Sequence, residues 1–158
     1  MATSVGISSG EGPALMTVAK RLVAFYLVAI GIVVAVSFIL TPVYNDGTID
    51  YPVWRILNWF MVAAALAILV VGFRRRRDPE RADVSAVEYL RGSFAYYGAI
   101  VLVMLMLWEW YWTLNPSSES GDAVTAHLIY FPLVNALFVV LALANGRYLW
   151  NEAGGSSD

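Results

Sequence analysis

Four long apolar runs divide the sequence, and they restrict its fold more than any other feature. We predict membrane spans at residues 22–40, 54–73, 94–114 and 128–149. At a rise of about 1.5 Å per residue, helices of this length cross the roughly 30 Å hydrocarbon core of a bilayer. A membrane-spanning strand needs only about nine to eleven residues and alternates apolar with polar side chains, which none of these runs does. The runs therefore predict four transmembrane helices.

The composition places these helices in lipid and not in a soluble bundle. Hydrophobic residues make up 59% of the 158-residue chain and charged residues 14%, whereas soluble domains have about 45–50% and about 25%. A helix of a soluble bundle has a polar outer face, and these runs are apolar all round. We expect an all-α integral membrane protein in which residues 1–158 form one domain, an up-down four-helix bundle.

The basic residues flanking the spans predict the orientation. Nine of them flank one side of the four spans, namely Lys20, Arg21, Arg74, Arg75, Arg76, Arg77, Arg81, Arg91 and Arg147. The other side has only Arg55. Because basic residues concentrate on the cytoplasmic side of membrane proteins, both termini are expected in the cytoplasm, with the chain in the cell membrane.

The segments outside the spans carry weaker signals. Residues 1–16 are rich in Gly and Ser and lack a basic residue, so they indicate a flexible tail and not a secretory signal. Residues 151–158 are expected to form a second flexible tail. Ser85 and Glu88 have the spacing of a capping box. A helix that begins there would be either a short interfacial helix before the third span, as we predict, or a direct extension of that span.

Pro132 falls near the start of the fourth run, where it removes the hydrogen bond to the carbonyl of residue 128. Either the helix kinks at this point, or the span begins at Pro132 after an interfacial segment at residues 123–131. We favour the second arrangement. Asn135 and Asn145 lie farther along the same span, and such amides usually help to hold neighbouring helices together.

A polar cluster is predicted at the outer end of the bundle. Arg55 and Glu109 lie at similar depths in antiparallel spans, Asn58 is one turn inward of Arg55, and His127 is at the same boundary. Glu109 is either an intramembrane site residue or part of an interfacial aromatic belt formed by Trp108–Trp112. We predict a structural ion pair between Arg55 and Glu109, with a ligand or proton site as the alternative.

The arginines at the end of the second span suggest contact with lipid. Arg74, Arg75, Arg76 and Arg77 are predicted to anchor the chain to anionic headgroups and to fix its topology. The alternative is a docking patch for an acidic partner, but Asp78, Glu80 and Asp83 follow and dilute the positive charge.

Several classes of function lack the residues they need. The chain has no cysteine, one histidine and a formal net charge of −2, so we predict no metal, no cofactor other than bound lipid, and no nucleic-acid partner. We expect an accessory or scaffold subunit of a larger membrane complex, with the bilayer and other membrane subunits or a second copy as partners. The alternative is a small homo-oligomeric transporter or channel. Whether the chain takes part in an enzyme complex is left open, but catalysis of its own is not expected.

Overall fold

The structure, a computed structural model, describes residues 11–44, 52–77, 85–113 and 122–155. They form four α-helices: α1 (Glu11–Tyr44), α2 (Pro52–Arg77), α3 (Ala86–Thr113) and α4 (Asp122–Gly154). Each contains a stretch long and apolar enough to cross a membrane. The predicted all-α fold with four membrane-spanning helices is confirmed, and the protein is a multi-pass membrane protein.

The helices extend beyond the predicted spans at both ends of the chain. α1 begins at Glu11, so residues 11–16 are helical although they were expected in a tail, and residues 1–10 lie outside the described residues. α4 continues to Gly154, within the expected C-terminal tail, and residues 156–158 are again outside the description. Contacts between the two helices account for the extra turns, because Ala153 is buried and Lys20 Nζ donates to Glu152 Oε1 at 2.8 Å.

Pro132 does not begin a new span. α4 runs through it without interruption, which corrects the prediction of a separate interfacial segment at residues 123–131. Packing of the preceding residue holds this part of the helix in place, since the Phe131 ring lies 4.8 Å from that of Trp54 and 5.9 Å from that of Phe38. Prolines are tolerated inside transmembrane helices when neighbouring helices support the interrupted backbone.

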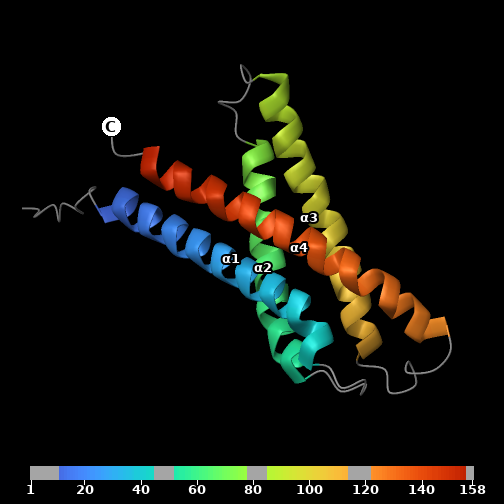
Figure 1. The fold of residues 1–158 in the computed structure, drawn as a ribbon. Helices are drawn as coiled ribbons and strands as arrows, with labels where there is room; N and C mark the ends of the chain where they lie inside the picture. The colour runs from blue at the N-terminus through green and yellow to red at the C-terminus, as the bar shows by residue number, and fades with distance from the viewer. Residues whose placement is uncertain (1–10, 45–51, 78–84, 114–121, 156–158) are drawn as a thin grey trace, which may run out of the picture.

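The short helix expected before the third span is not a separate element either. It forms the first turns of α3, which runs unbroken to Thr113 (Figure 1). Ser85 caps this helix: Glu88 N donates to Ser85 Oγ at 3.4 Å, and Tyr89 N donates to Ser85 O at 3.0 Å. The predicted start is thus confirmed, and the direct extension of the span is the arrangement that forms.

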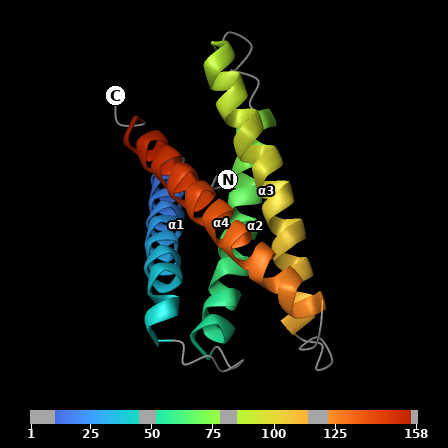
Figure 2. The same cartoon turned by 45° about the vertical axis from the view of Figure 1, so that its right-hand side comes forward.

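The helices pack as two antiparallel pairs. α1 lies along α4, α2 lies along α3, and α4 crosses the second pair obliquely (Figures 1 and 2). The last turns of α1 and α3 and the first turns of α2 and α4 lie at one end of the bundle, which we call the outer end. The first turns of α1 and α3 and the last turns of α2 and α4 lie at the opposite, inner end, so the up-down topology is as predicted.

The core is one continuous apolar cluster to which all four helices contribute. Its largest fully buried side chains include Phe138, Leu27, Met61, Ile68 and Leu102. The α1–α4 contact is the most extensive, and small residues allow it: Gly31 is buried against Ala142, and Gly146 lies against the backbone of α1. Close backbone approach through small residues is the usual way in which membrane helices associate.

Candidate functional site

Three of the four residues predicted to form a polar cluster lie at the outer end, on the adjacent helices α2 and α3. Arg55 is exposed in the first turn of α2, Asn58 is half-buried one turn inward, and Glu109 is half-buried near the end of α3. Next to them, the rings of Trp59 and Trp110 meet edge to face with centroids 4.7 Å apart. This contact fixes α2 against α3 at the level of the cluster. The ion pair between Arg55 and Glu109 remains a prediction.

The aromatic residues around this cluster connect helices to one another. Trp108 of α3 packs edge to face on Tyr130 of α4, with ring centroids 4.9 Å apart. Phe131 packs on α1 and α2 through Phe38 and Trp54, as described above. His127 lies in the first turns of α4, and its side chain is outside the described part of the structure. The aromatics thus pack between helices as well as at the outer surface.

The buried amides of α4 were expected to help hold neighbouring helices together, but the hydrogen bonds that they donate lie within α4. Asn135 Nδ2 donates to Phe131 O and Asn145 Nδ2 to Leu141 O, each at 2.8 Å and each within α4. The remaining polar atom of Asn145, Oδ1, is buried without a hydrogen-bond partner in the described structure. The NH2 group of each amide therefore donates within its own helix.

The four arginines at the end of α2 have different environments. Arg75 is largely buried: its Nη2 donates to Glu88 Oε1 at 2.7 Å, and its guanidinium lies over the Tyr148 ring, 4.2 Å from the centroid. Arg76 lies over the rings of Tyr96 and Tyr97, and Arg77 lies over Phe73 of its own helix. Arg74 is exposed. A run that looks uniform in sequence is thus divided between structural contacts and the surface.

A pocket opens beside Arg74 and Arg75, between α1, α2 and α4 at the inner end. It has a volume of about 460 Å³. The residues that line it are mostly apolar, with three cations and one carboxylate: Met16, Ala19, Lys20, Val23, Leu66, Ala67, Val70, Val71, Arg74, Arg75, Tyr148, Leu149 and Glu152. We call it the inner pocket. The sequence did not predict it, because it exists only where α1 and α4 pair and meet the end of α2.

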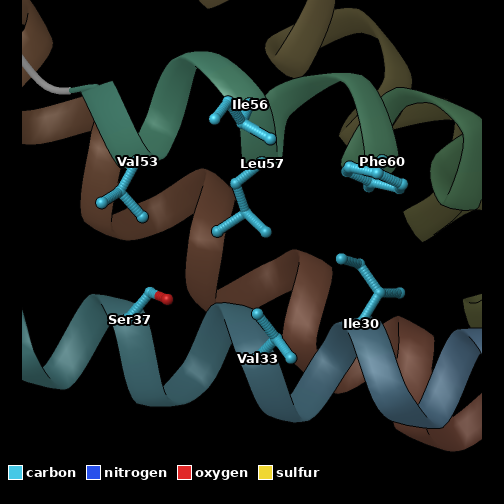
Figure 3. Close-up of a pocket in the computed structure, with 7 residues that line it drawn as sticks. All are labelled: Ile30, Val33, Ser37, Val53, Ile56, Leu57 and Phe60. Atoms are coloured by element: carbon cyan, nitrogen blue, oxygen red, sulfur yellow. The ribbon is translucent and has the colours of Figure 1, made fainter.

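A second hollow lies between α1 and α2 toward the outer end (Figure 3). It has a volume of about 400 Å³ and is lined by Ile30, Val33, Ser37, Val53, Ile56, Leu57 and Phe60. Figure 3 shows the α1 side chains pointing across the gap toward those of α2. Its single hydroxyl-bearing residue is Ser37, so the groove suits a hydrocarbon chain and not a polar solute.

The described residues hold no group of three or more His, Cys, Asp or Glu side chains that could bind a metal ion. The inner pocket, where cationic and apolar side chains converge, is therefore the candidate site with the most distinctive chemistry. The chain matches no protein-family model, no curated protein and no solved structure.

Proposed function

We propose that the chain is a non-catalytic accessory or scaffold subunit of a larger complex in the cell membrane. The observation that carries this proposal is the continuous apolar cluster in the centre of the bundle. In the described structure, the polar residues that are almost completely buried are Asn135 and Asn145, 2% and 1% exposed, and their amide groups donate to their own helix. Such an interior suits a structural role better than chemistry on a polar substrate.

The same core counts against the alternative of a transporter or channel within one chain. The polar cluster at the outer end is separated from the inner end by buried apolar side chains of α2 and α3, among them Met61, Ile68 and Leu102. A pathway for a polar solute needs hydrogen-bonding or charged groups along its length. A transporter would therefore need a path between several copies of the chain.

The outer surface of the helices is well suited to contacts in the membrane. Large hydrophobic side chains are exposed on every helix, for example Phe25 on α1, Trp59 on α2, Phe94 on α3 and Trp150 on α4. In a bilayer, this surface meets either lipid or the helices of partner proteins, which associate through close packing.

Purification of the tagged full-length chain from its own membranes in a mild detergent tests the proposal. We expect the same membrane proteins to be recovered in fixed stoichiometry. Tryptophan substitutions at lipid-facing positions, one on each helix, provide the control: Val36→Trp, Ala63→Trp, Val101→Trp and Val140→Trp. A specific partner should be lost with at least one of them.

Two results would overturn the proposal. One is co-purification that survives all four tryptophan substitutions equally, which indicates non-specific association. The other is a symmetric oligomer of this chain alone that moves a solute across liposome membranes.

A further inference from the structure

We propose that the inner pocket binds one anionic phospholipid, with the headgroup among the cations at its mouth and an acyl chain along its apolar wall. This goes beyond a structural role and is independent of whether a partner complex exists. The inference depends on the shape of the pocket, its charge and one buried donor.

The pocket has the amphipathic layout of a lipid. Leu66, Val70 and Arg74 all line it and follow one another at four-residue intervals on one face of α2. Four residues of helix rise about 6 Å, so this face runs from a cation at the membrane surface to side chains about 12 Å deeper in the hydrocarbon. A free inorganic anion would not contact the apolar part of the pocket, and an uncharged hydrocarbon would not pair with its cations.

The mouth of the pocket carries excess positive charge. Its lining includes Lys20, Arg74 and Arg75 together with the carboxylate of Glu152, and Glu88, which is outside the lining, pairs with Arg75 at 2.7 Å. Glu152 is bound to Lys20 at 2.8 Å, and within the described structure no acidic side chain contacts Arg74. Basic pockets between transmembrane helices on the cytoplasmic side are a known setting for anionic headgroups.

Arg75 supplies a donor that the protein itself leaves unused. Its side chain is 10% exposed, and its Nη2 is engaged by Glu88. Among the residues that the structure describes, its buried Nε has no hydrogen-bond partner. Buried donors are almost always paired, and a guanidinium binds phosphate oxygens through adjacent N–H groups. Arg75 lines the pocket, so a phosphate in its mouth would offer Nε an acceptor once the buried side chain turns toward it.

Native mass spectrometry of the full chain in mild detergent can measure this binding directly. The probes are phosphatidylglycerol and phosphatidylcholine with identical acyl chains. We expect phosphatidylglycerol to bind clearly more tightly. Arg74→Gln should weaken its binding about fivefold, as expected for one basic residue at an anionic headgroup. Ala67→Leu, which leaves the charge unchanged and fills the apolar wall, should weaken it as well.

Each variant has a matched control outside the pocket. Arg77→Gln removes an equal charge from the same cluster, and Ala63→Leu adds the same volume one turn away on α2. Both should bind phosphatidylglycerol like the unaltered chain. Circular dichroism and elution volume show whether each variant is folded, and Arg74→Gln alters an exposed side chain, so it keeps the test valid if Ala67→Leu misfolds.

Three results would overturn the proposal. Equal binding of the two lipids would remove the headgroup preference. Equal weakening by Arg77→Gln and Arg74→Gln would indicate a diffuse attraction to the whole basic cluster. Displacement of phosphatidylglycerol by millimolar inorganic phosphate, together with undiminished lipid binding by folded Ala67→Leu, would identify a site for small anions instead.

Discussion

Gly146 lies at a tight contact between α4 and α1. A Cβ built on it would be 2.7 Å from Val28 Cγ2, 3.1 Å from Ala24 O and 3.3 Å from Val28 N. Two of these three atoms belong to the backbone, so the contact cannot relax through a side-chain rotation alone. At the scale of single residues, this glycine sets how closely the two helices carrying the chain ends can pack.

Gly146→Ala is therefore expected to push α1 and α4 apart and to lower the free energy of unfolding by about 1–3 kcal/mol, the usual cost of overpacking. Gly98→Ala is the comparison, because its nearest neighbours all belong to one flexible side chain, that of Leu141, at 3.3 Å and beyond. Unfolding in mixed micelles measures both. Equal stability of the two variants would show that the α1–α4 approach is not tight.

Pairs of helices are held together by a small number of polar contacts in addition to apolar packing. α1 meets α2 less extensively than it meets α4, and the Tyr26 hydroxyl donates to the Phe60 carbonyl across this junction at 2.7 Å. At the inner end, Arg75 and Glu88 join the last turn of α2 to the first turn of α3.

Tyr26→Phe removes the hydroxyl and leaves the ring. Hydrogen bonds between membrane helices contribute about 0.6 kcal/mol on average and up to about 1.7 kcal/mol, so we expect a loss of stability in that range. Tyr89→Phe, on the exposed surface of α3, is the matched control and should have no effect. Identical unfolding curves for both variants would argue against the bond.

Two ion pairs described at the inner end, Arg75–Glu88 and Lys20–Glu152, should differ in strength. The side chains of Arg75 and Glu88 are 10% and 36% exposed, whereas those of Lys20 and Glu152 are 32% and 38% exposed, so the two pairs differ mainly in the burial of their cations. We expect Glu88→Gln to lower the free energy of unfolding by about 1–2 kcal/mol and Glu152→Gln by about 0.2–1 kcal/mol, as for exposed pairs. Double-mutant cycles with Arg75→Gln and Lys20→Gln give the coupling energies. A larger coupling for Lys20 and Glu152 would contradict this ranking.

Helix number and approximate span positions could be predicted from the sequence, because lipid requires every backbone group to be satisfied within its own helix. The start of α3 could be predicted from Ser85, since capping depends on neighbouring residues only. The effect of Pro132 could not be predicted from the sequence, because it depends on the packing of Phe131 against Phe38 and Trp54, residues remote in sequence.

The candidate site was less predictable than the helices. The basic run at residues 74–77 is visible in sequence, but its division into structural and exposed arginines is not. Arg75 becomes buried only because Tyr148 and Glu88 lie beside it. The inner pocket likewise depends on the pairing of α1 with α4, and helices that are apolar all round give no pattern from which the pairing can be read.

At the scale of the whole molecule, the two antiparallel pairs bring the first turns of α1 and α3 and the last turns of α2 and α4 to the inner end. Lys20, Arg74–Arg77, Arg91 and Arg147 belong to this end, because each lies near the helix terminus found there. Since basic residues favour the cytoplasmic side, we propose that the inner end faces the cytoplasm. The proposed subunit role and the proposed lipid site both use this orientation.

Cysteine labelling in intact cells tests the orientation most directly, and the absence of native cysteines makes single-cysteine variants unambiguous. A membrane-impermeant maleimide should label Thr48→Cys and Ser117→Cys in intact cells. It should label Ser85→Cys and Ser156→Cys only after the membrane is permeabilised. Labelling of Ser85→Cys in intact cells, with Ser117→Cys protected until permeabilisation, would contradict the four-span topology with both termini inside.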